Sequence, residues 1–197
     1  MPRRTGSYAA GRQRRDRIVE VAAARFAEDG YHRTSLARIA ADADLTEGGL
    51  LHHFPSKKHL LLAVAEHRIA TTAQWWAELD EDASVEAVFD RMAGTAERFL
   101  RQPGLIELFV LASAEAADPS SPAHAVFAER YRTAVDSLAA VFTRCVRRGE
   151  LAAGTDCDAL ARECVAVSDG LQLQWVLSDG RVDLVAGVRE HARRVLR

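Results

Sequence analysis

The chain of 197 residues has only three cysteines, five prolines and two lysines. Cys145, Cys157 and Cys164 are odd in number and form no CxxC pair, which predicts reduced thiols. A redox sensor built from Cys157 and Cys164, seven residues apart, is the alternative. None of the prolines, at positions 2, 55, 103, 119 and 122, interrupts a long periodic segment.

Long apolar runs are also missing. No run approaches about 18 apolar residues, the length that a membrane-spanning helix requires, so no membrane partner is expected. The first residues, "MPRRTGSYAAGRQRRDR", are basic but no apolar core follows them, which is unlike a secretory signal. The cytoplasm is therefore the expected location.

An overall excess of positive charge is absent as well, because the net charge is -2. The distribution along the chain is uneven. Residues 1–70 hold 12 Arg and Lys against 8 Asp and Glu, whereas residues 71–197 hold 14 against 20. A positive first third on an acidic remainder suggests a polyanionic partner at one end of the molecule.

Strand signals are almost absent, and apolar residues recur at the three- and four-residue spacing of helices. We predict an all-α fold of about nine helices with three short helices before a bundle of longer ones. The first helix should run from about Arg12 to Asp29, with Gly30 as its stop. The second should begin after a cap at Thr34 or Ser35, and the third after a cap at Thr46. The other helices are expected at about 56–79, 84–101, 104–117, 122–148, 158–178 and 182–196.

The stretch "ADADLTEGGLLHHFPSKKHLLLAV", residues 41–64, places two glycines, two histidines and both lysines together. A metal site is disfavoured because adjacent helical histidines point about 100 degrees apart, unlike an i, i+4 pair. A phosphate loop is disfavoured because the GxxxxGK[ST] pattern and a preceding strand are missing. We therefore predict no metal and no cofactor.

A helix-turn-helix explains this stretch better. Two short helices joined by a tight turn let the second helix lie in the major groove of DNA. Glycine costs about 1 kcal/mol relative to alanine inside a helix, so Gly48 and Gly49 suggest that bulk is excluded on that face. Asp44 tolerates the strained turn conformation. The helix macrodipole does not explain Lys57 and Lys58 at a helix start, which favours an external anion.

The segment "FAEDGYHRTSLARIAADADLTEGGLLHHFPSKKHLL" resembles the DNA-binding region of the tetracycline-repressor (TetR) family of bacterial regulators. The resemblance covers about residues 14–62, including "TSLARIA", Gly48 and "HHF". It implies a helix-turn-helix DNA-binding domain at 1–55 and a ligand-binding and dimerisation domain at 56–197. Three residues depart from the family pattern and affect the expected operator sequence: Asp44 replaces a glycine, Leu51 a tyrosine, and Glu47 an often basic residue.

The resemblance also implies individual roles. Phosphates would be held by Thr34, Ser35, Thr46, Lys57 and His53. Base edges would face Glu47, Gly48, Gly49 and His52, although His52 could instead only cap its helix. Arg12, Arg14, Arg15 and Arg17 would form a flexible arm that reaches phosphates or the minor groove.

The body of the molecule should enclose an apolar chamber with a few polar groups, as is usual in this family, although most of its aromatic residues could simply form a packed core. The expected lining residues are His67, Trp75, Phe99, Glu107, Phe109, Phe127, Tyr131, Gln172 and Trp175. If Glu107 faces inward, a cationic or hydrogen-bonding ligand would be favoured.

The last two helices should form a homodimer, because a helix that is apolar on more than one side requires a second partner. The predicted interface consists of Ala161, Val165, Gln172, Val185, Val188 and Ala192. A two-fold dimer would read a palindromic operator in double-stranded DNA.

The sequence therefore predicts a ligand-responsive regulator, most simply a repressor that a small apolar molecule releases from DNA. The helix at 56–79 would transmit the signal. A ligandless DNA-binding or protein-adaptor dimer is the alternative. An enzyme is disfavoured because no activated nucleophile, paired carboxylates or cofactor loop is evident.

Overall fold

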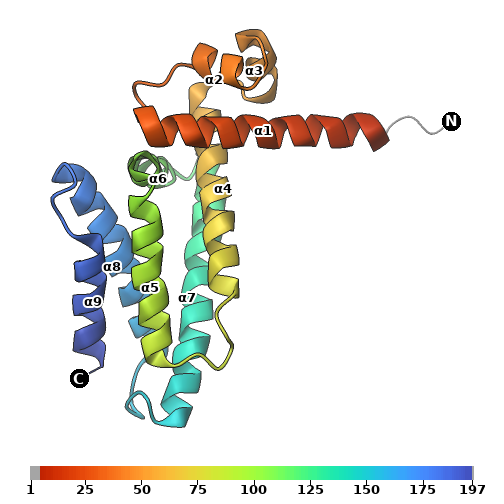
Figure 1. The fold of residues 1–197 in the computed structure, drawn as a ribbon. Coiled ribbons are helices and arrows are strands. Elements are labelled where there is room, and N and C mark those ends of the chain that lie inside the picture. Colours follow the sequence, from red (N-terminus) through yellow and green to blue (C-terminus); the bar gives the residue numbers. More distant parts are fainter. Residues whose placement is uncertain (1–4, 197) are drawn as a thin grey trace. The chain divides into compact units, whose positions relative to one another are not determined.

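The computed structural model describes the backbone of residues 5–196 and the side chains of residues 11–196. This part of the chain contains nine α-helices and no strand, which confirms the predicted all-α fold (Figure 1). The helices are α1 (Thr5–Asp29), α2 (Leu36–Asp42), α3 (Glu47–His53), α4 (Lys57–Ala77), α5 (Val85–Leu100), α6 (Pro103–Glu115), α7 (Ala123–Arg148), α8 (Cys157–Leu177) and α9 (Leu184–Val195).

The first helix is longer than predicted. It begins at Thr5 instead of near Arg12, so Arg12, Arg14, Arg15 and Arg17 lie on α1. The expectation of a flexible arm formed by these arginines is therefore wrong. Arginine and glutamine make up most of residues 12–17 and are good helix formers, which explains why the helix continues through them.

The chain divides into two compact units. The first comprises the chain up to Arg68 together with Gln102–Ala112, and the second comprises Ile69–Arg101 and the chain from Ser113 onward. Residues of α4 and α6 thus belong to both units. The sequence analysis placed a boundary between a DNA-binding and a ligand-binding domain after residue 55. This functional division remains a prediction.

The first unit contains α1, α2 and α3, with the two short helices on one side of α1 (Figure 1). Its core includes Ile18, Ala22 and Phe26 from α1, and all three are fully buried. Ile39 of α2 and Leu50 of α3 join them. Apolar residues at helical spacing thus hold the short helices against α1.

The turn between α2 and α3 has the form of a Schellman motif. Asp44 adopts a left-handed conformation with φ of 57°, as its role in the turn predicted. The amide of Leu45 donates to the carbonyl of Ala40 at 2.8 Å, and the amide of Asp44 donates to that of Ala41 at 3.2 Å. These two bonds satisfy carbonyls at the end of α2 and fix where α3 begins.

The second unit packs α5, α7, α8 and α9 around an apolar core. Phe89 of α5, Phe142 of α7, Cys164 of α8 and Val188 of α9 are all buried. Arg130 of α7 binds both carboxylate oxygens of Asp169 on α8, at 3.2 and 3.1 Å. This bidentate ion pair adds a directional link to the apolar packing of α7 against α8.

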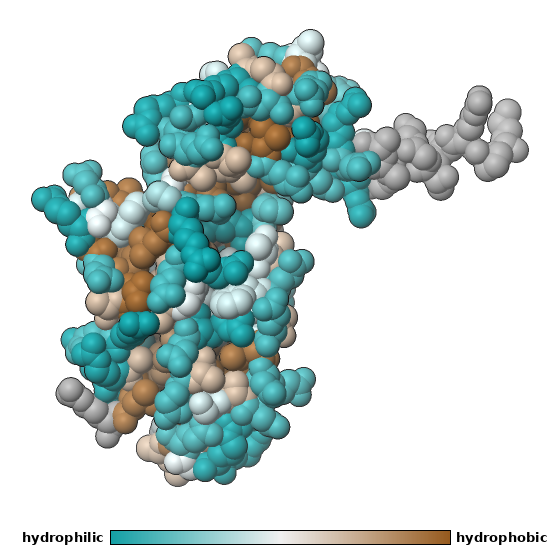
Figure 2. Space-filling view, in the orientation of Figure 1, coloured by the Kyte–Doolittle hydropathy of each residue, from teal (hydrophilic) through white to brown (hydrophobic). Residues whose placement is uncertain are grey.

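Apolar area is nevertheless exposed on the surface, and part of it lies over α8 and α9 (Figure 2). Leu173 and Leu177 of α8 are among the exposed large apolar side chains, and Leu177 is 75% exposed. No helix within the described residues combines the length and apolar character that crossing a membrane requires.

Candidate nucleic-acid interface

The start of α3 presents polar groups to solvent. Thr46 caps the helix, because its Oγ1 accepts a hydrogen bond from the amide of Gly49 at 3.1 Å. The cap was predicted from the sequence and is confirmed. Thr46, Glu47, Gly48 and His52 are all exposed, so one continuous side of α3 is available to a partner. A short helix with one polar, exposed side is the element that a helix-turn-helix places in the major groove of DNA.

The two glycines of α3 have different surroundings. A Cβ atom on Gly48 would meet only the Oγ1 of Thr46 at 4.0 Å, so the space above Gly48 is open. A Cβ on Gly49 would lie 3.3 Å from the same Oγ1 and 3.8 Å from Leu45 Cδ2. The capping residue and the turn therefore account for Gly49, and only Gly48 fits the expectation of a surface cleared for DNA.

The end of α3 contacts α1 through Arg15. Its guanidinium lies 4.3 Å from the centre of the Phe54 ring, and its Nη1 donates to the carbonyl of His53 at 3.5 Å. Burial lowers the pKa of His53, and the nearby charges of His52, Arg14 and Arg15 lower it further. His53 is therefore mainly neutral at pH 7. Arg15 stabilises the end of α3 through its contacts with Phe54 and His53 and is not part of a flexible arm.

Lys57 has partners inside the protein. Its Nζ lies 4.5 Å from the centre of the Tyr31 ring and donates to the carbonyl of His32 at 3.4 Å. Partial burial lowers the pKa of this amine. Contacts with Tyr31 and His32 thus explain why a lysine is tolerated at the start of α4, so no external anion is needed to explain Lys57.

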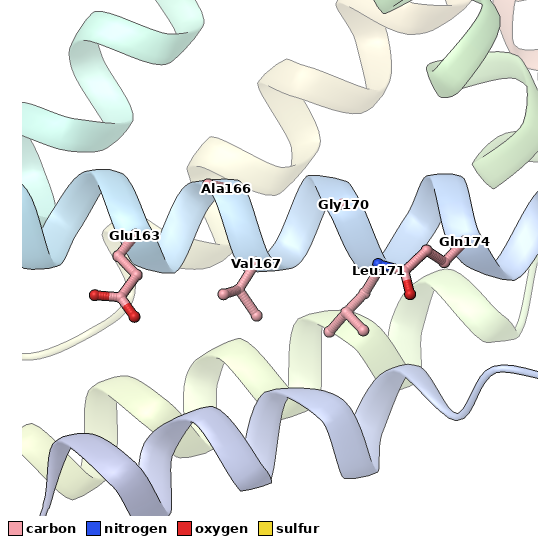
Figure 3. Close-up of a pocket in the computed structure, with 6 residues that line it drawn as sticks. All are labelled: Glu163, Ala166, Val167, Gly170, Leu171 and Gln174. Atoms are coloured by element: carbon pink, nitrogen blue, oxygen red, sulfur yellow. The ribbon is translucent and has the colours of Figure 1, made fainter.

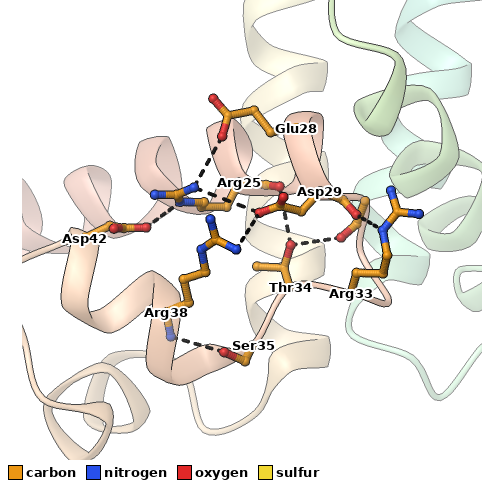
Figure 4. A network of polar contacts seen from close by, with 9 residues as sticks. Arg25, Glu28, Asp29, Arg33, Thr34, Ser35, Arg38 and Asp42 are labelled. Carbon is orange, nitrogen blue, oxygen red and sulfur yellow. Dashed lines mark hydrogen bonds and ion pairs between the residues drawn. The ribbon is translucent and has the colours of Figure 1, made fainter.

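Thr34 and Ser35, adjacent in sequence, occupy different environments (Figure 4). The Thr34 side chain is buried, and its hydroxyl donates to the carbonyls of Gly30 at 2.9 Å and Arg25 at 3.3 Å. Thr34 is therefore unavailable to a phosphate. Ser35 is exposed and caps α2 by accepting from the amide of Arg38 at 3.2 Å. Because a hydroxyl has a donor and two acceptor sites, Ser35 retains its donor for a phosphate oxygen.

Arg12 and Arg14 lie on α1 with exposed side chains. Arg17, one turn further on, forms a surface ion pair with Asp44 at 3.5 Å. The exposed arginines of α1 and the polar side of α3 thus belong to the same compact unit.

The residues predicted to line an effector chamber are distributed over both units. His67, Glu107 and Phe109 belong to the first unit, whereas Trp75, Phe99, Phe127, Tyr131, Gln172 and Trp175 belong to the second. The Oε2 of Glu107 lies 3.4 Å from the position that a Cβ on Gly30 would occupy. Glu107 therefore faces the end of α1, and the idea that it recognises a cationic effector receives no support from its position.

Two of these aromatic residues already contact charged side chains. The guanidinium of Arg68 lies 4.7 Å from the centre of the Phe109 ring, and Arg68 is buried. Trp75 has the guanidinium groups of Arg91 and Arg98 at 3.9 and 4.6 Å from its ring centre. Cation–π contacts of this kind stabilise the protein itself.

Tyr131 lies beside an ion pair that the sequence did not reveal. Burial raises its pKa to about 12, and the charge of Asp169 and a hydrogen bond to it act in the same direction. Arg130, Tyr131 and Asp169 therefore form a polar cluster between α7 and α8. Arg130 and Asp169 are separated by 39 residues, and no helical spacing relates side chains so far apart.

The predicted dimer residues mostly face the interior of their own unit. Ala161, Gln172, Val188 and Ala192 are buried, whereas Val165 and Val185 are half-buried. α8 also lines a shallow groove of about 320 Å³, formed by Glu163, Ala166, Val167, Gly170, Leu171 and Gln174. On the α9 side of this groove, Leu171 packs against Gly187, and the Glu163 carboxylate lies 3.7 Å from Nδ1 of His191. Ala166, Leu173 and Leu177 of α8 are exposed. Glu163, Val167 and Leu171 project from the same side of the helix (Figure 3).

The three cysteines are free thiols. Cys157 and Cys164 both lie on α8, two turns apart, so their Cα atoms are about 10 Å apart, beyond the reach of a disulfide. A disulfide between Cys157 and Cys164 is therefore excluded in this fold. The described residues contain no group of three His, Cys, Asp or Glu side chains that could hold a metal ion.

The arrangement of a capped α2, a tight turn and an exposed α3 defines a helix-turn-helix DNA-binding protein. Residues 18–64 match the family described as "Bacterial regulatory proteins, tetR family", and residues 105–197 match "BetI-type transcriptional repressor, C-terminal". The chain belongs to the TetR family of bacterial transcriptional regulators.

The chain is also similar in sequence to a curated bacterial regulator and shares its fold with solved structures. The fatty acid metabolism regulator protein of Bacillus subtilis (strain 168) is 23% identical over 172 residues, which cover 86% of this chain and 87% of that protein. The crystal structure of FadR from Bacillus subtilis with stearoyl-CoA has a TM-score of 0.71 at 19% identity, covering 91% and 96% of the two chains. A transcriptional regulator from Saccharomonospora viridis, solved with choline, has a TM-score of 0.71 at 23% identity, covering 91% and 93%.

The expectation of a DNA-binding transcriptional regulator is thus confirmed. Regulators of this family bind operator DNA and small-molecule effectors and act as dimers. The relatives named above are regulators of transcription or metabolism, and none is described as an enzyme.

Proposed function

We propose that this chain is a homodimeric repressor that binds a palindromic operator and leaves it when a small apolar effector binds. The observation that carries the proposal is the exposed side of α3, with Thr46, Glu47, Gly48 and His52 open to solvent. A seven-residue helix that displays polar groups and an open glycine on one side suits insertion into the major groove.

The contact surface divides into two kinds of residue. Arg12, Arg14, Ser35 and Thr46 would bind phosphates, because they are exposed and offer guanidinium or hydroxyl donors. These contacts position the protein on DNA without reading its sequence.

Glu47, Gly48 and His52 would face the base edges. Glu47 is exposed, and a carboxylate in the major groove accepts a hydrogen bond from the amino group of cytosine. Three other residues would support α3 without contacting the bases, because each already interacts with groups of the first unit: Lys57, Arg15 and His53. Gly49 would serve the helix cap, and Thr34 is excluded from the surface by its burial.

The second copy of the chain would dock on the open side of α8. Ala166 and Gly170 lie there, and the exposed Leu173 and Leu177 continue this apolar surface along the same face of the helix. Exposed apolar surface of this kind marks an interaction site. This surface replaces the interface predicted from the sequence, most of whose residues are buried within their own unit.

The dimer surface can be tested with two exposed alanines. Ala166→Arg places a charge in the α8 groove, whereas Ala140→Arg places the same charge on the exposed side of α7. We expect sedimentation to show monomers for Ala166→Arg and dimers for Ala140→Arg. A dimeric Ala166→Arg protein would show that the second copy docks elsewhere.

The effector is proposed to be apolar, with a long-chain acyl thioester as the first candidate. Support comes from the relative of similar length that was solved with stearoyl-CoA. The regulator solved with choline makes a small cation the second candidate. Effector binding would change the distance between the α3 helices of the two copies in the dimer. The helices α4 and α6 would transmit this change, because each contributes residues to both units of the chain. We further propose that the protein works in the cytoplasm, where its DNA is found, without a cofactor or enzymatic activity.

Selection of bound duplexes from a random pool tests the DNA-binding proposal. We expect enrichment of a palindrome whose half-sites lie about one helical turn apart. Stearoyl-CoA is then added to the complex with the enriched duplex, with choline in a parallel arm. Release of the duplex by stearoyl-CoA would support an apolar effector. Release by choline alone would show instead that the effector is a small cation. If neither compound releases the duplex, the favoured function becomes that of a ligandless DNA-binding dimer. No enriched palindrome at low salt would refute the proposal.

A further inference from the structure

Arg25 and Asp42 connect the end of α1 to the end of α2. The Nε of Arg25 donates to the Oδ2 of Asp42, and the two side chains are only 25% and 32% exposed. The Nη1 of Arg25 also lies 3.3 Å from Glu28 Oε2 and 3.9 Å from Asp29 Oδ2. Arg25 thus joins three carboxylates at one point of the first unit (Figure 4).

The other end of α2 is tied to α1 by different groups. The hydroxyl of Thr34 donates to the carbonyls of Gly30 and Arg25, and Nη1 of Arg38 lies 3.4 Å from Oδ2 of Asp29. Polar contacts therefore hold both ends of α2 on α1. Buried Ile39 and Ala40 supply the apolar contact between those ends.

The placement of Asp42 gives its ion pair a consequence for α3. Asp42 is the last residue of α2, and α3 begins five residues later, after the Schellman turn. A helix of seven residues is unstable by itself, so its orientation depends on what it packs against. Apolar contact is not directional, whereas a hydrogen bond to a charged group is short and directional.

We propose that Asp42, through Arg25, is a positioning residue for DNA recognition. It holds the α2–α3 pair at the angle at which the exposed side of α3 meets the base edges. Asp42 would touch no DNA itself. This inference rests on the proposed function, in which α3 reads the DNA bases. It means that the contact between Arg25 and Asp42, which does not touch DNA, contributes to the choice of DNA sequence.

Simple electrostatics predicts the opposite effect for Asp42→Asn. This change removes a negative charge from a DNA-binding unit, which should strengthen attraction to phosphates. It also removes an acidic group from a helix C-terminus, where the macrodipole disfavours it. Positioning predicts instead that binding to the correct sequence becomes weaker, because the charge-assisted bond to Arg25 is replaced by a weaker bond to a neutral acceptor.

Asp44→Asn provides a matched control. It removes the same charge two residues away, at a side chain that is 86% exposed and has a surface ion pair with Arg17. Its left-handed conformation with φ of 57° accepts asparagine. The control therefore removes the same charge and leaves the contact between Arg25 and Asp42 intact.

The experiment measures the affinity of each full-length variant for two duplexes at one salt concentration: the palindrome enriched by the wild-type protein, and a scrambled duplex. We expect Asp42→Asn to bind the palindrome about tenfold more weakly, or about 1.4 kcal/mol, and the scrambled duplex at least as well as wild type. Asp44→Asn should bind both duplexes as well as wild type or better. Asp42→Glu, which keeps a carboxylate, should recover most of the discrimination.

An unchanged affinity ratio for folded Asp42→Asn would overturn the proposal. If circular dichroism shows that this variant has lost helix, Arg25→Lys takes its place, because it keeps the charge and lacks the Nε donor. An unchanged ratio in folded Arg25→Lys would overturn the proposal equally. Failure of the wild-type protein to enrich any duplex would instead refute the proposed function, so the two failures are distinguishable.

Discussion

Gly104 on α6 lies very close to the backbone of α1. A Cβ atom at this position would lie 2.0 Å from the carbonyl oxygen of Phe26 and 2.8 Å from that of Ala27. It would also lie 2.9 Å from the Cα of Ala27. All three are backbone atoms of α1, so no side-chain rotation can relieve the contact. We predict that Gly104→Ala destabilises the first unit.

The expected magnitude follows from two opposing effects. Forcing an extra methyl group into a packed site costs about 1–3 kcal/mol, whereas replacing glycine by alanine in a helix stabilises it by at most about 1 kcal/mol. Because the contact is with rigid backbone at 2.0 Å, the cost should lie at the upper end of this range, and the net loss should be about 2 kcal/mol. For a unit of this size, 1 kcal/mol corresponds to about 4–8 °C in melting temperature.

Gly94→Ala is the matched control, because Gly94 lies inside α5 and its Cβ would meet Trp75 Cζ2 at an ordinary 3.8 Å. This variant should be as stable as wild type or slightly more stable.

Two spectroscopic signals separate the units. All three tryptophans, Trp75, Trp76 and Trp175, belong to the second unit, so their fluorescence reports its unfolding, whereas far-ultraviolet circular dichroism reports both units. Gly104→Ala should lower the circular dichroism transition and affect the fluorescence transition less. A Gly104→Ala protein as stable as wild type, or an equal loss in Gly94→Ala, would refute the reasoning.

Three further predictions concern titration, thiol chemistry and DNA affinity. Burial lowers the pKa of His191, so the unfolded chain binds its proton more tightly, and the second unit should lose stability as pH falls through about 6.5. Urea unfolding followed by tryptophan fluorescence should show this loss, and His191→Gln should reduce it; an identical pH dependence would contradict the assignment. Burial raises the pKa of Cys145 to about 11 and of Cys164 to about 12, so a thiol reagent at pH 7.5 should modify Cys157 first, as peptide mass spectrometry can verify. Equal modification of all three thiols would show that the buried ones are accessible. Arg14→Ala should reduce the slope of log affinity against log salt by about 1 if Arg14 contacts a phosphate, and an unchanged slope would remove it from the contact surface.

Local signals in the sequence predicted the local structure well. The helical period and capping residues located all nine helices in the described part of the chain to within a few residues, apart from the early start of α1. Thr46 at the start of α3 and Asp44 in the turn have the predicted conformations. These features depend on neighbours within one or two turns, which is why the sequence contains the information.

Contacts between distant residues could not be predicted in the same way. Thr34 and Ser35 looked equally suited to capping and phosphate binding, but only packing buries the first and exposes the second. The pairs Arg25–Asp42 and Arg130–Asp169 join residues 17 and 39 positions apart, and no periodicity relates them. Gly48 and Gly49 looked alike, yet the Thr46 side chain restricts only the second.

The dimer surface shows the same limit on a larger scale. Periodicity revealed that α8 has more than one apolar side, but it could not say which side faces its own unit. The structure buries Ala161 and Gln172, packs Leu171 against α9, and leaves Ala166, Leu173 and Leu177 exposed.

The sequence by itself thus determined the helices, their caps and the helix-turn-helix, because these arise from short-range patterns of side chains. Tertiary structure alone decided which polar groups are buried, which charges pair and which apolar side remains open. Those outcomes depend on how all the helices pack together into a close-packed core, which the sequence of any one segment does not reveal.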